Sequence, residues 1–279
     1  MPHEVHRLLG SIYNQPHLIL ESAMHPIVDY LNARNVSGVQ LAVVPHEMKA
    51  KPKAEQVASM GEIKIDSTLT FKPIMGACGA TEGTSYQGIL QECEELISLG
   101  VDTIILTHSS PGGQAQMAFD CATCLRDMCD EANVRLISYV ETMSASASYL
   151  IAAVSDEIVC HPEAMVGSIG AMIAIIDRSK AFAQAGIKPI YLSSTPGKIP
   201  FDAEGQFTEK FLSKMQEEAT ALGTKFAQHV SDNTGISLKD VLAMDAEMFH
   251  ADEALKLGLV NQIMSQKQFA QYLVDSKGK

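Results

Sequence analysis

The stretch that decides the fold is VDTIILTHSSPGG, residues 101–113. The short apolar run at its centre, TIILT, is typical of a strand buried on both faces of a parallel sheet. A proline and two glycines follow the run, and they predict a turn into the next helix. Open α/β sheets bind ligands at the carboxyl ends of their strands, so this turn is a candidate binding site.

Strand and helix patterns alternate on both sides of this stretch. GILQECEELISLG, residues 88–100, predicts an amphipathic helix that ends at Gly100. VRLISYVE (134–141) and DEIVCHP (156–162) predict two further strands, with a serine-rich helix start between them. A long helix is expected over about residues 207–232. This alternation predicts an α/β fold with a mostly parallel sheet.

Composition shifts divide the chain into four segments. The helical pattern ILESAMHPIVDYLNAR predicts an N-terminal helical segment over residues 1–45. Residues 46–62 are rich in Lys, Pro and Glu, which predicts a mobile linker or surface excursion. The alternating patterns predict one domain over residues 63–265, followed by a C-terminal tail, residues 266–279.

Charge and hydropathy exclude several partners. The 279 residues carry a net charge of −12, and no cluster of Lys and Arg stands out, so nucleic acid is not expected as a ligand. No apolar run approaches the length of a transmembrane helix, and the N-terminus lacks the pattern of a secretory signal. We therefore expect a cytoplasmic protein without a membrane anchor.

Cysteines and histidines give little sign of a metal or cofactor. Cys121 and Cys124 form a CxxC pair inside a predicted helix, but no second pair follows. The nine histidines form no HExxH-type pair. We expect reduced cysteines, no metal and no cofactor.

Three serines in ETMSASASYLIAAVSDE, residues 141–157, raise the question of a nucleophile. On a helix, Ser144 and Ser148 lie about 40° apart, and Ser146 points to the opposite side. Ser144 is then the expected cap and Ser148 a packing residue. Ser146 falls in the first turn, where free N–H groups stabilise negative charge. The alternative that all three only cap and pack remains open.

A serine nucleophile needs a base, and no histidine clearly supplies one. His108 precedes the glycine turn, but its side chain could equally point into the sheet. A lysine can serve if burial lowers its pKa, and a shift of about 3 units costs about 4 kcal/mol. Lys180 and Lys188 are expected in solvent. Lys198 is flanked by Pro, Gly and Ile, although an exposed turn lysine is an open alternative.

At this point the motifs resemble a known family. SPGG (110–113), MSASASYLIAAVSDEIVCHPEAMVGSIGA (143–171) and STPGKIPFD (194–202) are similar to the signal-peptide-peptidase-like Ser/Lys proteases, which share the ClpP/crotonase fold. YNQPHLILESAMHPIVDYLNAR (13–34) and FHADEALKLGLVNQI (249–263) resemble more specifically the prohead proteases of tailed phages. The resemblance implies a ClpP/crotonase-like spiral of βαβ units.

The resemblance also implies a role for particular residues. It makes Ser146 the nucleophile, Lys198 the general base and Ser168 the residue that orients the lysine. The oxyanion donors would be the backbone N–H groups of Gly113 and Ala147, and the mechanism an acyl-enzyme one without a cofactor. Relatives usually have Gly or Ala where Ser148 stands, and many have a polar residue before the lysine.

The resemblance finally implies substrates and partners. It predicts an endopeptidase that cleaves scaffold, portal or capsid proteins during procapsid assembly, inside the bacterial host cytoplasm. A homo-oligomeric ring is expected, in which Lys198 serves its own chain or a neighbour. The alternatives are a cellular signal-peptide-peptidase-like protease, a crotonase-type acyl-CoA enzyme and a non-catalytic scaffold-binding shell protein.

Overall fold

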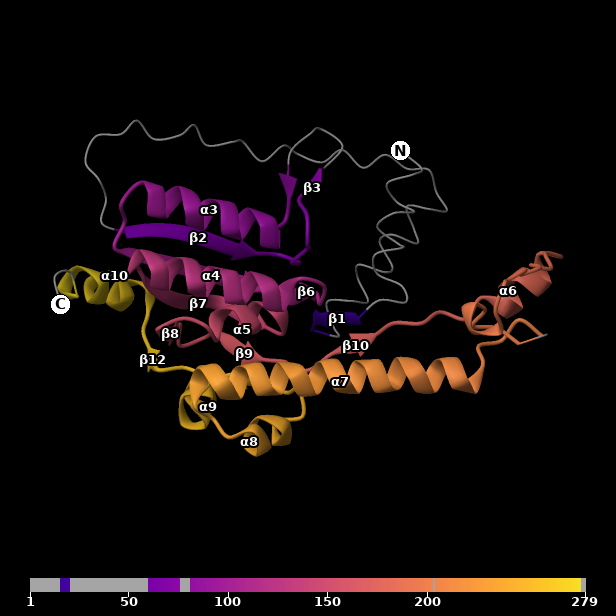
Figure 1. The fold of residues 1–279 in the computed structure, drawn as a ribbon. Coiled ribbons are helices and arrows are strands. Elements are labelled where there is room, and N and C mark those ends of the chain that lie inside the picture. The colour runs from indigo at the N-terminus through magenta and orange to yellow at the C-terminus, as the bar shows by residue number, and fades with distance from the viewer. Residues whose placement is uncertain (1–15, 21–59, 76–80, 203, 277–279) are drawn as a thin grey trace.

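A computed structural model describes residues 16–20, 60–75, 81–202 and 204–276 (Figure 1). In the described residues the main sheet has seven strands in the order β11-β9-β7-β5-β2, with β8 and β12 continuing from β7. All strand pairs in it are parallel except β11 with β9. The strands are β2 (Met60–Asp66), β5 (Thr103–Ser110), β7 (Arg135–Ala145), β8 (Glu157–Cys160), β9 (Met165–Gly167), β11 (Met248–His250) and β12 (Gln262–Ile263). The prediction of a mostly parallel α/β fold is confirmed.

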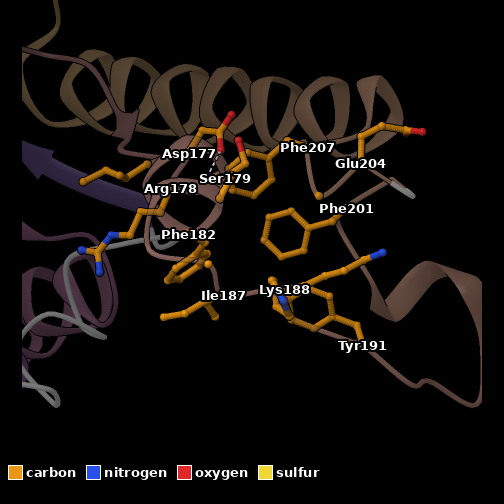
Figure 2. A pocket seen from close by; sticks show the side chains of 15 residues that line it. Asp177, Arg178, Ser179, Phe182, Ile187, Lys188, Tyr191, Phe201, Glu204 and Phe207 are labelled. Carbon is orange, nitrogen blue, oxygen red and sulfur yellow. Dashed lines mark hydrogen bonds between the residues drawn. The ribbon is translucent and has the colours of Figure 1, made fainter.

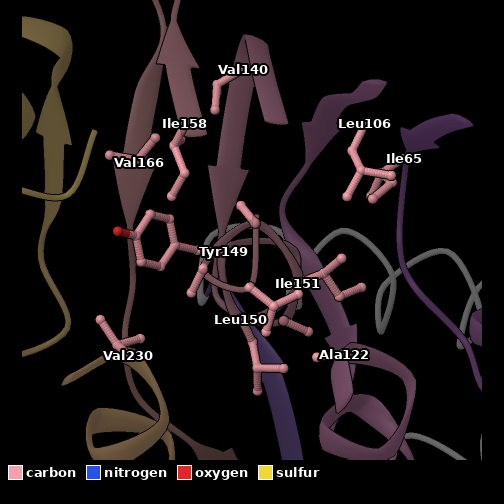
Figure 3. Packing of buried hydrophobic residues seen from close by; sticks show 14 of the residues in the cluster. Ile65, Leu106, Ala122, Val140, Tyr149, Leu150, Ile151, Ile158, Val166 and Val230 are labelled. Atoms are coloured by element: carbon pink, nitrogen blue, oxygen red, sulfur yellow. The ribbon is translucent and has the colours of Figure 1, made fainter. Parts of the chain in front are cut away.

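Helices α3, α4, α5 and α7 contribute buried side chains to the main core beside this sheet, and Figure 3 shows part of it, from Ala122 of α4 to Val230 of α7. The strands present their apolar residues to this core at every second position, as in β2, where Ile63 and Ile65 are buried and Lys64 is exposed. The helices are α3 (Tyr86–Ser98), α4 (Ala118–Ala132), α5 (Ala147–Ala152), α6 (Ser179–Gln184), η1 (Pro196–Lys198), α7 (Glu209–Thr234), α8 (Leu238–Ala243), α9 (Ala251–Leu257) and α10 (Gln266–Asp275).

Helix α10 covers part of the opposite face of the sheet. It begins with a capping box at Ser265, and the ring of Phe269 stacks on Tyr139 at a centroid distance of 4.3 Å. Phe269 belongs to a second, smaller core with Ile137 and Val159. Residues 266–275 therefore form a docked helix where the sequence suggested only a tail.

A second sheet of three short antiparallel strands stands beside the first. Its order is β10 (Met172–Ile173), β1 (Pro16–Ile19) and β6 (Gly112–Gln114), and a separate hairpin pairs β3 (Ile74–Met75) with β4 (Thr81–Glu82). The strand β1 falls inside the predicted helical segment 1–45, whose remaining residues except Leu20 lie outside the described ones. Its backbone finds partners on both sides, and these contacts between distant segments override the local helical pattern. Similarly, residues 60–62 of the predicted linker belong to β2.

The segment of residues 174–207, called the arm below, leaves the sheet and lies beyond the N-terminal end of α7 (Figure 1). It contains α6 and η1. Most of its described side chains are exposed, including those of large apolar residues. The chain thus has a well-packed body and a poorly covered arm.

Candidate active site

The central strand β7 changes its partner just before the serine-rich segment. Its first half pairs with β8 and its second half, Met143–Ala145, with β9. Against β5 the register shifts between His108 and Ser109, so that Glu141 and Thr142 have no β5 partner. A bulge of this kind bends a strand and re-aims the residues that follow it. The bend carries Ala145 toward the end of β9.

Ser146 lies in the sharp turn between β7 and α5. Its backbone has φ 54° and ψ −120°, a left-handed conformation that costs a non-glycine residue about 1–3 kcal/mol. The turn is held by the bonds from Ser146 N to Gly167 O and from Leu150 N to Ser146 O, both 2.9 Å. Its Oγ is buried and has no hydrogen-bond partner in the part of the chain that the structure describes. A strained, unpartnered serine after a strand is the geometry expected of a nucleophile.

The glycine turn after β5 touches Ser146 directly. A Cβ on Gly112 would lie 2.9 Å from the Ser146 Cβ and 2.9 Å from the Ala145 carbonyl oxygen. Gly112 also has φ 93°, so only glycine fits this position without strain. The close approach places the backbone of Gly112 and Gly113 beside the serine. The two turns follow β5 and β7, which are adjacent and parallel, so they meet at one edge of the sheet.

Ser168 stands next to Ser146 at the end of the neighbouring strand. The residues before them, Ala145 and Gly167, are paired in the β7–β9 ladder. Ser168 also has a positive φ, 53°, and its N–H donates to Glu247 O at 2.8 Å. The structure therefore brings together Ser146, Ala147, Ser168 and the two glycines.

His108 does not contact Ser146. It is fully buried on the helix-covered face, with Nδ1 2.9 Å from Ser148 Oγ and Nε2 3.0 Å from Ser138 Oγ. The Oγ of Ser144 lies 3.0 Å from Ser148 Oγ and 3.3 Å from the same Nδ1. Burial lowers the pKa of His108 to about 3, so the ring is neutral near pH 7. This network of hydroxyls and one imidazole ties β5, β7 and α5 together beneath the turn.

Of the three serines, Ser144 lies in a different element from the one the sequence predicted. Ser144 is the expected cap but lies in β7, because pairing with β9 extends that strand. Ser146 occupies the N-cap position without a side-chain capping bond. Ser148 packs inside α5 as predicted, and its hydroxyl is satisfied by His108. The hydroxyls of Ser144 and Ser148 both have partners, and that of Ser146 has none among the described residues.

Lys198 lies far along the chain in η1, on the arm, and is exposed. Among the described residues, no hydrogen bond or ion pair engages its amine. The arm extends beyond the N-terminal end of α7, on the side away from α5 (Figure 1). Within one chain, Lys198 does not hydrogen-bond Ser146, whose Oγ has no partner among the described residues.

The arm has a small aromatic cluster of its own (Figure 2). The rings of Tyr191 and Phe201 stack with centroids 5.1 Å apart, and the Phe207 ring lies tilted against Phe201 at 4.8 Å. They border a cavity of about 440 Å³ that Phe182 and Ile187 also line. None of the residues around Ser146 lines this cavity. The aromatic cluster and its cavity lie within the arm, and they do not include Ser146 or its neighbours.

Cysteines and metal ligands do not form a site in the described chain. Five described cysteines are free, and Cys121 is buried while Cys124 is partly exposed. No group of three His, Cys, Asp or Glu side chains that could hold a metal ion occurs there. Nor does this part of the chain contain a helix long and apolar enough to cross a membrane.

The geometry agrees with a comparison against protein families. Residues 129–278, more than half of the chain, match peptidase family S49. This chain belongs to peptidase family S49. The recognition of a signal-peptide-peptidase-like protease from the sequence motifs is thereby confirmed.

Three relatives show which members of family S49 are similar. The capsid assembly protease C of Escherichia phage lambda is 28% identical over 202 residues, 72% of this chain and 44% of that protein. The head-tail preconnector protein GP5 of Enterobacteria phage P21 is 26% identical, over 65% of this chain and 36% of that protein. The probable protease SohB of Haemophilus influenzae is 25% identical over 73% and 58%. The chain thus spans less than two thirds of each relative.

Among solved structures, a point mutant of ClpP1 from Listeria monocytogenes is similar to this chain. The TM-score is 0.45 at 13% identity, over 74% of this chain and 92% of that one.

Proposed function

We propose that this chain is a serine endopeptidase that cleaves phage head proteins during procapsid assembly. The proposal rests on the setting of Ser146. Its buried hydroxyl has no partner among the described residues, and it lies in a strained turn beside Gly112. Membership of family S49 supports peptide hydrolysis. Two relatives carry names that refer to capsid assembly and to the head-tail preconnector, which supports head proteins as substrates.

In the proposed mechanism, Lys198 is the general base. Its uncharged amine takes the proton of Ser146 while Oγ attacks the carbonyl carbon of the scissile peptide. The tetrahedral oxyanion receives hydrogen bonds from the backbone N–H groups of Gly113 and Ala147. The lysine ammonium then returns its proton to the leaving amine, and water hydrolyses the acyl-enzyme.

Ser168 is proposed to orient the lysine. It stands beside Ser146 because the residues that precede the two serines are paired between β7 and β9. Its positive φ and the bond from its N–H to Glu247 O fix the backbone there. A hydroxyl held at this place can accept a hydrogen bond from an amine that approaches Ser146.

We further propose that Lys198 reaches a serine of a second copy of the chain. The arm exposes large apolar side chains, with Leu192 at 94% and Ile190 at 80% of their full exposure. Large apolar side chains exposed close together in sequence are a feature of many protein interfaces. A lysine acts as a base in its uncharged form, and desolvation in such an interface favours that form. A homo-oligomer, with a closed ring as the expected form, would both cover the exposed apolar side chains and desolvate the lysine.

The proposal is tested by expressing the chain together with candidate head proteins and identifying new termini by mass spectrometry. Wild type is expected to produce defined cleavages that Ser146→Ala and Lys198→Ala abolish. Lys180→Ala is the matched control, because Lys180 is an exposed lysine of the same arm, and it should cleave normally. Cleavage that persists in Ser146→Ala would show that another residue is the nucleophile.

A fluorophosphonate probe separates a protease from the acyl-CoA alternative. The probe should form one adduct, at Ser146, and the adduct should disappear in Ser146→Ala. A crotonase-type enzyme, which uses no serine nucleophile, would not be labelled. A non-catalytic shell protein would neither be labelled nor cleave.

A further inference from the structure

The N-terminal strand β1 lies between two strands that adjoin the candidate active site. It is the central strand of the small sheet, antiparallel to β6 on one side and to β10 on the other. β6 begins at Gly112, which touches Ser146, and β10 follows shortly after Ser168. β1 thus fills the gap that these two strands leave next to the nucleophile.

The backbone of β1 engages a proposed oxyanion donor. The register pairs Leu18 with Gly113. The bonds on either side of this pair run from Leu20 N to Pro111 O at 2.9 Å and from Ala115 N to Pro16 O at 3.4 Å. Hydrogen-bonded pairs alternate along an antiparallel ladder, so the pair between them is hydrogen-bonded as well. The N–H of Gly113 is therefore occupied by the carbonyl group of Leu18.

The same carbonyl group lies close to the nucleophile. The position that a Cβ on Gly112 would take is 2.3 Å from the Leu18 carbonyl oxygen and 2.9 Å from the Ser146 Cβ. Both Leu18 and Ser146 are completely buried. A peptide carbonyl next to the serine and bonded to the oxyanion donor is what a bound substrate would present.

Extended peptides commonly bind proteins by adding a strand to a sheet edge. Without β1, both β6 and β10 would have unpaired N–H and C=O groups facing the gap, and such edges bind further strands. The side chains of Leu18 and Ile19 are buried, so the gap accepts bulky aliphatic residues. Its geometry suits an extended apolar peptide.

We propose that β1 is a resident occupant of the substrate groove and competes with substrate for it. The groove between β6 and β10 binds extended peptide segments with aliphatic side chains, and the chain is latent while β1 is docked. Displacement or removal of β1 frees the N–H of Gly113 for a substrate carbonyl. The inference rests on the proposed protease function.

The test compares the rate at which a fluorophosphonate labels Ser146 in several full-length or shortened chains. One variant lacks residues 1–20, and another carries Leu18→Asp, which would place a carboxylate in the apolar groove. Labelling should accelerate about tenfold or more in both, because a carboxylate cannot take the place of a fully buried leucine without loss of docking. Leu242→Asp is the matched control, since Leu242 is exposed on α8, and it should label like wild type.

A synthetic peptide with the sequence of residues 14–22, NQPHLILES, provides the converse experiment. Added to the shortened chain, it should slow labelling of Ser146 and inhibit peptide cleavage competitively. A peptide with the same residues in scrambled order should do neither. Circular dichroism of each variant shows whether it has kept its fold.

The outcomes distinguish failure of the β1 inference from failure of the proposed protease function. Faster labelling of the β1 variants, reversed by the peptide, supports the inference. Folded variants that label no faster than wild type, or variants that unfold, would overturn it, because β1 would then be an ordinary structural strand. If no form of the chain, with or without β1, labels at Ser146 or cleaves peptides, the proposed function itself fails.

Discussion

The helix that follows Ser146 and the arm that carries Lys198 are covered to opposite degrees. All six residues of α5 are buried, and the core around Leu150 and Ile151 is continuous with the sheet (Figure 3). The arm instead exposes Ile187, Ile190 and Leu192. The helix after the proposed nucleophile is thus fully buried, whereas the arm that carries the proposed base exposes large apolar side chains. In the assembly proposed above, a second copy of the chain would cover these exposed side chains.

The largest expected contrast comes from one substitution made in each region. Leu150→Ala should cost about 2–5 kcal/mol of unfolding free energy, because it empties part of the core. Leu192→Ala should change the stability of the isolated chain by less than about 0.5 kcal/mol. It should nevertheless weaken self-association. Urea unfolding at low protein concentration and sedimentation velocity measure the two effects.

Two results would contradict this contrast between the core and the arm. If Leu192→Ala destabilised the isolated chain as much as Leu150→Ala, the arm would be packed within its own chain. If it left both self-association and cleavage unchanged, the exposed apolar surface would not be an interface.

The next largest effect concerns the neutral, buried imidazole of His108. Its pKa is lowered from 6.5 to about 3 by burial, so the unfolded chain binds a proton at a higher pH than the folded chain. The neutral ring therefore contributes stability above pH 6.5, and that stability is lost as the pH falls toward 3. The full effect is on the order of 5 kcal/mol. Urea unfolding at a series of pH values measures it.

His108→Gln serves as the comparison for this pH effect. The variant should be less stable at pH 7, because the bonds to Ser138 and Ser148 are disturbed. Its stability should fall less steeply than that of wild type between pH 6.5 and 3. An equally steep fall in the variant would assign the acid sensitivity to other groups.

A smaller effect distinguishes buried from exposed serines. Ser148→Ala removes a hydroxyl bonded to His108 and Ser144 and should cost about 1–2 kcal/mol. Ser193→Ala removes an exposed hydroxyl of the arm that bonds Thr195 O, and should cost less than about 0.5 kcal/mol. Thermal unfolding compares the two variants. Ser148→Ala should still be labelled at Ser146, and loss of labelling would make Ser148 part of the reacting site.

The sequence predicted the regions where a single segment determines its own structure. The apolar run of β5 and the periodic helix α3 appear within a few residues of their predicted bounds. The glycine turn was predicted as a candidate binding site because it follows the carboxyl end of a parallel strand, and it lies beside Ser146. These features depend on local patterns and on general topology.

Other features depend on partners that are distant in the chain. Ser144 lies in a strand because β9 pairs with β7, and β1 is a strand because β6 and β10 flank it. The short apolar run HLIL, residues 17–20, is the signal that would have found β1 inside the helical pattern. The contacts of Lys198 could not be predicted from the sequence around it, because in the proposed assembly its partners belong to another copy of the chain.

The most direct measurement co-expresses two inactive chains, Ser146→Ala and Lys198→Ala, with different affinity tags. Mixed assemblies carrying both tags are purified and tested for cleavage of a head protein that wild type cleaves. We expect the mixture to regain part of the wild-type activity, because the lysine of one chain serves the serine of the other. Mixed assemblies that stay inactive while wild type cleaves would contradict a site shared between two copies.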